Sequence, residues 1–170
     1  KYNRSGGYKY VAYDNDGKMI PVLAESYDIT PDGKTVTFNL RKGVTWHDGK
    51  PFTSADVQFT IMEVLKKVHP RGPNSFKEVS SIDTPDAHTA VFNLDNPAPY
   101  MMRALSAYES PMVPKHHLEG QDIKSAKLAN NPVGTGPFKF TEWKKGQYIR
   151  LDKNEGYWKE GRPYIDRIVG

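Results

Sequence analysis

The chain has 170 residues, a length that fits one domain or one domain with part of a second. Its hydrophobic fraction of 37% and charged fraction of 26% are those of a globular protein and exclude an intrinsically disordered chain. No apolar run approaches the length that crosses a bilayer, and residues 1–7 lack the apolar stretch of a secretory signal. The absence of cysteine excludes disulfides, thiolate metal sites and cysteine nucleophiles.

The net charge of +4 reflects a small excess of 24 basic over 20 acidic residues. The basic residues form no block. Lys66, Lys67 and Arg71 cluster, but Glu63 and Glu78 flank them. A solvated helix end explains this cluster better than a phosphate-binding patch does. The sequence therefore predicts no nucleic-acid partner.

A strand and a turn are predicted near the N-terminal end of the chain. Residues 8–13 have the composition of a strand, and the Asp-Asn-Asp-Gly segment of residues 14–17 follows as a turn. An EF-hand calcium loop needs glycine at its sixth position, but Gly17 falls at the fourth. The turn is therefore favoured over a calcium site.

A half-buried strand is predicted after the next turn in the chain. The Thr-Pro-Asp-Gly turn of residues 30–33 leads into residues 34–40. In that segment the apolar side chains occupy every second position and share one face: Val36, Phe38 and Leu40. A further turn, His-Asp-Gly-Lys-Pro, is predicted at residues 47–51.

The clearest helix is predicted to begin at Thr53. Thr53 and Asp56 form a variant capping box, with aspartate in place of the usual glutamate or glutamine. Apolar residues then recur at helical spacing and form one stripe: Val57, Ile61, Val64, Leu65 and Val68. Pro70, Gly72 and Pro73 end the helix.

The second half of the chain contains further strand and helix patterns. Residues 78–82 and 89–94 are expected to pair around a Thr-Pro-Asp turn at residues 84–86. A helix is predicted over residues 97–107, and a short helical turn over residues 114–118.

A hairpin is predicted near the C-terminal end, from residues 138–143 and 148–153 around residues 144–146. Residues 164–169 are expected to begin another strand, and truncation from a longer protein would explain why this strand stops at Gly170. Strand and helix patterns are mixed and do not alternate as they do in βαβ units. The predicted fold class is therefore α+β, with a mostly antiparallel sheet and a few packed helices.

No motif in the sequence demands catalysis, a metal or a cofactor. There is no G-x-S-x-G elbow, and the Gly-Thr-Gly-Pro of residues 134–137 precedes a strand pattern instead of the helix that a phosphate loop needs. The five histidines lack the spacing that places two metal ligands on one helix face. Adjacent His116 and His117 are expected to point in different directions. The sequence predicts ordinary histidines, no metal site and no enzyme.

Four blocks of sequence occur in a characteristic order over nearly the whole chain. They are residues 21–27 with 31–44, residues 46–57, residues 131–140, and residues 154–158 with 162–166. In order and spacing they resemble the family of bacterial extracytoplasmic solute-binding proteins for oligopeptides, dipeptides and nickel, known as family 5. These blocks mostly specify fold, so they identify the family without naming the ligand.

The resemblance implies a small subdomain plus part of the main lobe of a periplasmic-binding-protein-like fold (class II, cluster C type). Residues 1–20 would form a strand and turn at the edge of the main lobe, and residues 21–132 the small α+β subdomain. Residues 133–170 would form the crossover and the first hairpin of a truncated main lobe. Family members have two lobes that close over a ligand, so we expect an N-terminal fragment that lacks the second lobe.

The resemblance also implies a function, which is the substrate-binding component of an ABC importer. Its partners would be an oligopeptide or dipeptide ligand and an ABC permease of the inner membrane. Its location would be periplasmic or extracytoplasmic, although this chain contains no signal sequence. Two alternatives remain open: a solute-sensing domain of a transcriptional regulator, and a binding protein for nickel chelates or oligosaccharides. A helix-turn-helix upstream of the chain would favour the regulator, and a signal peptide would favour transport.

Two segments are expected to approach the ligand cleft, by analogy with the family: residues 74–76 and residues 108–110. They supply the ligand-binding candidates Asn74, Phe76, Tyr108, Glu109 and Ser110. A tyrosine there offers a ring and a hydroxyl group to a peptide, and a glutamate offers a carboxylate to an amino group. A packed tyrosine and a solvated glutamate are the alternative.

Overall fold

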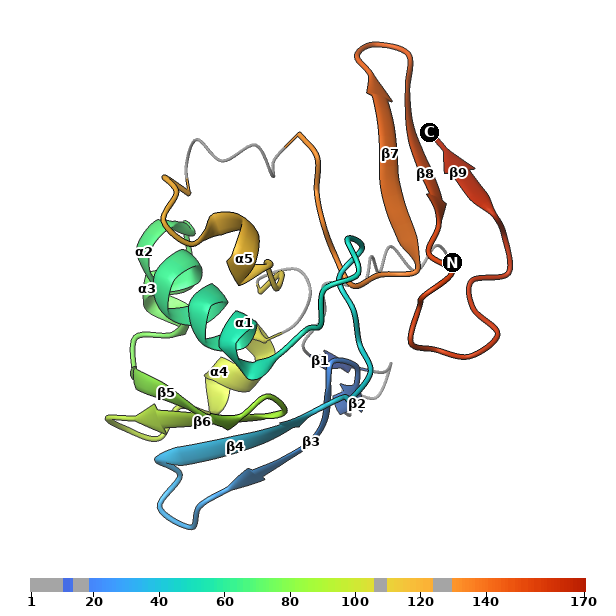
Figure 1. Ribbon diagram of the computed structural model, residues 1–170. Coiled ribbons are helices and arrows are strands. Elements are labelled where there is room, and N and C mark those ends of the chain that lie inside the picture. The colour runs from blue at the N-terminus through green and yellow to red at the C-terminus, as the bar shows by residue number, and fades with distance from the viewer. Residues whose placement is uncertain (1–10, 14–18, 106–109, 124–129) are drawn as a thin grey trace.

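The computed structural model describes residues 11–13, 19–105, 110–123 and 130–170 (Figure 1). A four-stranded antiparallel sheet lies at its centre, in the order β3-β4-β6-β5. The strands are β3 (Ala24–Ile29), β4 (Thr35–Leu40), β5 (Val79–Asp86) and β6 (Thr89–Leu94). The predicted turn before β4 is confirmed, because the Gly33 N–H donates to the Thr30 carbonyl at 2.8 Å. Gly33 adopts a φ of 68°, which glycine reaches without a Cβ clash.

The two central strands of this sheet carry the main hydrophobic core. The predicted alternation of β4 is confirmed, because Val36, Phe38 and Leu40 are all buried. On β6, Ala90 and Phe92 are buried in the same way. The rings of Phe38 and Phe92 lie 5.1 Å apart in an edge-to-face arrangement, which aromatic pairs favour. This face of the sheet therefore needs a covering layer.

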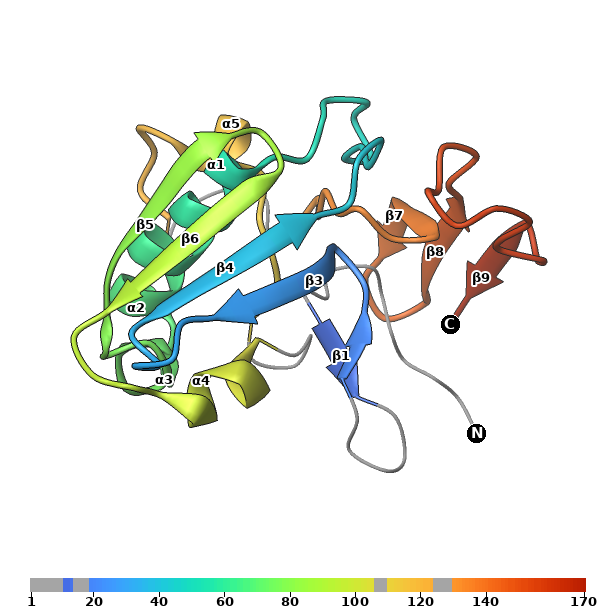
Figure 2. The same cartoon turned by 90° about the horizontal axis from the view of Figure 1, so that it is seen from below.

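Helices supply that layer on one face of the sheet (Figures 1 and 2). A continuous helix consists of α1 (Ser54–Phe59), the π-helical η1 (Thr60–Leu65) and α2 (Lys66–Val68). The shorter helices are α3 (Gly72–Ser75), α4 (Pro99–Ala104) and α5 (Lys115–Leu118). The predicted start is confirmed, since the Thr53 N–H donates to the Asp56 carboxylate at 2.9 Å. The predicted helical turn over residues 114–118 is confirmed as α5.

The π-helical turn of the long helix was not predicted from periodicity. Val57, Ile61 and Leu65 are buried at a spacing of four residues. An α-helix has ~3.6 residues per turn, so a spacing of four drifts around its surface. The wider turn of η1 compensates for this drift and keeps the row facing the core. Val64 and Val68, which were predicted in the same stripe, are only half-buried.

Two other features differ from prediction. The long helix ends at Val68 as expected, but Gly72 and Pro73, which were expected only to end it, belong to the short helix α3. Proline suits the first turn of a helix. Gly72 is required there, since a Cβ atom would lie 1.8 Å from the carbonyl oxygen of Leu65. The helix predicted over residues 97–107 is shorter, because α4 ends at Ala104 and Leu105 forms a turn.

The β5–β6 hairpin is confirmed, but its turn was misplaced. The turn lies at Ala87 and His88, where the Asp86 carboxylate accepts the His88 N–H at 2.7 Å. The expected turn residues, 84–86, belong to β5. This strand lies at an edge of the sheet, and the pairing shifts between Asp83 and Asp86. An edge position of this kind tolerates proline, which has no N–H to donate.

Two smaller sheets complete the fold. β1 (Val11–Tyr13) pairs with β2 (Met19–Pro21), and β7 (Phe138–Lys144), β8 (Tyr148–Lys153) and β9 (Arg167–Val169) form a three-stranded antiparallel sheet. The predicted C-terminal hairpin is confirmed, and the final strand begins at Arg167 instead of residue 164. Residues 8–10 and the turn at residues 14–17 lie outside the described residues.

The predicted α+β class with mostly antiparallel sheets is confirmed. The three-stranded sheet stands beside the helical layer, and residues 130–137 connect the two (Figure 1). The division at residues 20 and 132 stays a prediction. Among the residues that the structure describes, no helix has the length and apolarity needed to span a membrane.

Candidate functional site

The side chain of His47 binds the crossover segment, residues 130–137. The Gly134 N–H donates to His47 Nδ1 at 3.1 Å, and His47 Nε2 lies 3.0 Å from the Gly136 carbonyl oxygen. Because Nδ1 accepts a hydrogen bond, the proton of a neutral ring must be on Nε2, which donates to Gly136. Burial lowers the pKa of His47 and so favours this neutral form. The ring thereby joins the turn at residues 47–51 to the crossover.

Asn154 attaches the same segment to the three-stranded sheet. Its buried side-chain amide donates to the Gly136 carbonyl at 2.9 Å, and its backbone N–H donates to the Pro137 carbonyl at 2.8 Å. The Gly136 oxygen is therefore shared between His47 and Asn154. The prediction that residues 134–137 form a loop before a strand is confirmed, since strand β7 begins directly after them, and their role as a crossover between lobes stays a prediction.

Asp56 connects three parts of the fold, although sequence reasoning identified only its role as a helix cap. Its buried carboxylate accepts the Thr53 N–H at 2.9 Å, the Trp46 Nε1–H at 3.3 Å and the Lys115 N–H at 2.9 Å. A buried carboxylate requires donors of this kind to offset its lost hydration. Asp56 therefore fixes the position of α5 against α1.

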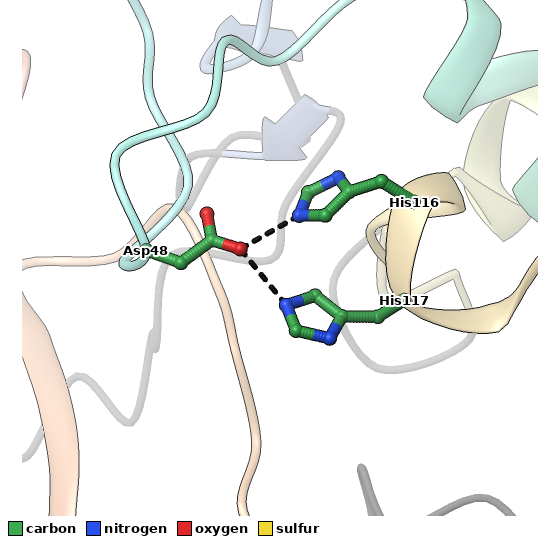
Figure 3. Close-up of side chains that lie close together, drawn as sticks. All are labelled: Asp48, His116 and His117. Atoms are coloured by element: carbon green, nitrogen blue, oxygen red, sulfur yellow. Dashed lines mark hydrogen bonds and ion pairs between the residues drawn. The ribbon is translucent and has the colours of Figure 1, made fainter.

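Asp48, His116 and His117 converge at the surface, next to the crossover (Figure 3). Asp48 Oδ2 lies 2.6 Å from His116 Nε2 and 2.8 Å from His117 Nε2. The imidazole ring centroids are only 4.6 Å apart. The expectation that the two histidines point in different directions was wrong. Their Cβ atoms leave the helix in different directions, but rotation about the side-chain bonds turns both rings toward one carboxylate oxygen.

The carboxylate of Asp48 is an anion at neutral pH. Partial burial opposes its ionisation, but hydrogen bonds from His116, His117 and the Lys50 N–H outweigh burial and lower the pKa of Asp48 to about 2. The Lys50 N–H donates to Oδ1 at 3.2 Å, so Oδ2 is left to face the two imidazoles.

Those predicted ligand residues that the structure describes, Asn74, Phe76 and Ser110, do not form one surface. Asn74 is exposed on α3, whereas Phe76 packs in the hydrophobic core. Ser110 is also buried, and its hydroxyl donates to the Ala104 carbonyl. Neither Phe76 nor Ser110 presents side-chain surface to a ligand in this chain. Two of the candidates lie outside the described residues: Tyr108 and Glu109.

A further concave surface, which sequence reasoning did not identify, lies beside the three-stranded sheet. This open hollow has a volume of ≈ 460 Å³ and is lined by Pro137, Phe138, Tyr157, Lys159, Arg162, Pro163, Tyr164 and Ile165. The Arg162 guanidinium lies 3.7 Å from the centroid of the Tyr164 ring. Aromatic rings beside cationic side chains can bind apolar groups and anions.

Solved structures with the same arrangement are solute-binding proteins. NikZ from Campylobacter jejuni, in complex with Ni(L-His), matches with a TM-score of 0.83 and 32% identity over 95% of this chain and 32% of its own. The oligopeptide-binding protein AppA from Bacillus subtilis, in complex with a nonapeptide, also matches with a TM-score of 0.83. Its identity is 33%, over 95% of this chain and 32% of its own. These matches define the class as a periplasmic-binding-protein fold.

Residues 18–169 match the family described as bacterial extracellular solute-binding proteins, family 5 Middle. The chain belongs to this family, as its sequence blocks indicated. A putative ABC transporter peptide-binding protein of Brucella ovis is 36% identical over 165 residues, which are 94% of this chain and 31% of the relative. Di/tripeptide-binding protein 1 of Pseudomonas aeruginosa is 35% identical over 89% of this chain and 32% of its own length. The chain thus spans about a third of the relatives that it matches.

Proposed function

We propose that this chain is part of the substrate-binding component of an ABC importer, which captures peptide-like solutes outside the cytoplasmic membrane and delivers them to a permease. The match to the solute-binding family over residues 18–169 carries this proposal. Relatives named as ABC transporter peptide-binding and di/tripeptide-binding proteins support peptides as the solute class. Binding of this kind involves no covalent step, so we propose a non-enzymatic role.

In this proposal the chain acts mainly as scaffold. The four-stranded sheet and its helices share one hydrophobic core, and the hydrogen bonds of His47 and Asn154 attach the crossover to its neighbours. Ligand capture needs a second lobe that closes over the solute. Peptide selectivity would come from backbone hydrogen bonds and adaptable water contacts. Asn74, Tyr108 and Glu109 remain our proposed contacts to the ligand.

Calorimetric titration of the full-length protein with a peptide library tests the proposal. We expect at least one peptide to bind with micromolar or tighter affinity, and the 170-residue chain alone to bind weakly or not at all. Asn74→Ala and Tyr108→Ala should weaken binding with little loss of fold. Asn39→Ala is a matched control, because Asn39 is an exposed strand residue whose amide donates to Ser26. Binding of sugars without any binding of peptides would refute the peptide assignment.

Nickel chelates are the second candidate ligand, because the similar NikZ structure is a complex with Ni(L-His). The same titration with Ni²⁺ and L-histidine distinguishes the two ligand classes. High affinity for the chelate together with no measurable binding of peptides would favour this candidate. The regulator alternative is tested by the sequence upstream of this chain, where a helix-turn-helix segment would replace the transport assignment.

A further inference from the structure

The cluster of Asp48, His116 and His117 has no role in the function proposed above. Its three ligand atoms, two imidazole nitrogens and one carboxylate oxygen, all lie within 4.8 Å of one another (Figure 3). Two imidazoles with one carboxylate are a common ligand set for divalent transition metals, whereas Mg²⁺ and Ca²⁺ prefer oxygen ligands alone. The composition of the cluster therefore points to a transition metal.

The spacing of these atoms is close to that of a metal site. Ligand atoms around a tetrahedral ion with bonds of ~2.0–2.1 Å are about 3.3 Å apart. Asp48 Oδ2 now lies 2.6 Å from one Nε2 atom and 2.8 Å from the other, the distances of hydrogen bonds. The two imidazoles would have to withdraw by only about 0.5–0.7 Å to admit an ion at ordinary bond lengths. Small side-chain rotations provide such a shift.

The surroundings hold the ligands in place and leave them accessible. The exposed fractions of the side chains are 27% for Asp48, 21% for His116 and 41% for His117, so an ion can enter and water can complete its coordination. The Lys50 N–H orients the Asp48 carboxylate. The Lys115 N–H is bound to the buried Asp56 carboxylate, which fixes the start of α5 just before the two histidines. Contacts of this kind, behind the ligands, strengthen metal binding.

We propose that Asp48, His116 and His117 bind one divalent transition-metal ion of the Zn²⁺ or Ni²⁺ class. The ion would link the turn at residues 47–51 to helix α5. It takes the place of the proton that each Nε2 atom now directs at the carboxylate, so each imidazole carries its proton on Nδ1 when the ion is bound. Because the ion binds the folded state, it raises the melting temperature of the protein.

Zinc titration of the tag-free, metal-stripped protein tests this proposal. We expect one Zn²⁺ ion to bind, with no added L-histidine and with no comparable response to Mg²⁺. His116→Ala and His117→Ala should each weaken Zn²⁺ binding at least about tenfold, the least that loss of a direct ligand should cost. His69→Ala and His88→Ala are matched controls that remove one histidine elsewhere, and both should bind Zn²⁺ like the unchanged protein.

Two further measurements keep the test independent of folding defects and of the importer proposal. Circular dichroism shows whether each variant is folded, and Co²⁺ substitution should give visible absorption that the His116→Ala/His117→Ala double variant lacks. If that folded double variant binds Zn²⁺ as tightly as the unchanged protein, or if the unchanged protein binds none, the cluster is only a hydrogen-bonded ion pair and the proposal fails. Peptide binding by the full-length protein is measured separately, so failure of one proposal does not imply failure of the other.

Discussion

The two larger sheets of the molecule differ in how they bury apolar surface. In the four-stranded sheet, alternate residues of β4 and β6 are buried beneath the helices. Among the described residues, the buried hydrophobic side chains all lie between Leu23 and Leu118. The three-stranded sheet instead exposes Trp143, Ile149 and Ile168. The first region is thus stabilised by its own core, and the second by backbone pairing, surface ion pairs and the crossover contacts.

The largest test of this comparison removes one apolar side chain from each sheet. Phe92→Ala should lower the free energy of unfolding by about 3–5 kcal/mol, because it leaves a cavity in the core. Ile149→Ala should cost less than about 1 kcal/mol, since that side chain is 42% exposed. Urea denaturation measures both values. Equal losses would contradict the difference between the sheets.

Loss of the Asp56 carboxylate should have the next largest effect. Asp56→Ala leaves the Thr53, Trp46 and Lys115 N–H groups without their acceptor, at a cost of about 2–4 kcal/mol in the free energy of unfolding. Asp28→Ala, an exposed aspartate on β3, is the control and should change stability by less than about 0.5 kcal/mol. Chemical denaturation of both variants checks the ranking. Similar values for the two would show that Asp56 is no more than a surface charge.

The crossover contacts should have a smaller and more local effect. His47→Ala and Asn154→Ala should each lower the free energy of unfolding by about 1–2 kcal/mol. Hydrogen exchange at residues 133–137 should accelerate in these variants, while β4 and β6 stay protected. The double variant should lose more than the sum of the singles, because only the loss of both donors leaves the Gly136 carbonyl without either hydrogen bond. Strictly additive losses would indicate independent contacts.

Acid should produce the smallest effect, which we follow in the three-stranded sheet. Hydrogen bonds from Arg150 and then Arg167 lower the pKa of Asp152 below its usual value. A depressed pKa stabilises the fold above the unfolded value near pH 4, and this stabilisation is lost as the pH falls further. Amide exchange in β8 and β9 should therefore accelerate below about pH 4.

Asp152→Asn is the control for this acid effect, since the amide does not titrate. Amide exchange in β8 and β9 of this variant should not accelerate below about pH 4, after correction for the intrinsic pH dependence of exchange. The β4–β6 pairing serves as an internal reference within the same sample. If β4 and β6 open together with β9, the two sheets unfold as one unit.

The sequence correctly predicted those elements that a local pattern of residues defines. These are the alternating strand β4, the helix cap at Thr53 and the C-terminal hairpin. β3 gave no such signal, because it is an edge strand with five of its six residues exposed. The π-helical turn and the turn at Ala87 and His88 depend on contacts with other elements.

The candidate site was harder to predict than the fold. Asp48 and His116 are separated by 68 residues, and no local spacing links a turn residue to a distant helix. The convergence of His116 and His117 arises only after Asp56 places α5 against α1. Phe76 and Ser110 were assigned from family position alone, and their burial could be known only from the packed core. Long-range contacts, not residue types, were the missing information.

The order of strands in the central sheet has a consequence for synthesis of the protein on the ribosome. β4 pairs with β6, in a register that joins Thr35 to Asn93 and Asn39 to Thr89, and the long helix and β5 lie between them in sequence. The β3–β4 hairpin therefore emerges while the other edge of β4 has no partner. At ~5–20 residues per second, the intervening stretch of about 50 residues takes roughly 3–10 seconds to synthesise. During that interval the nascent chain exposes an unpaired strand edge beside the apolar face of β4, and chaperones or misassembly would act on it then.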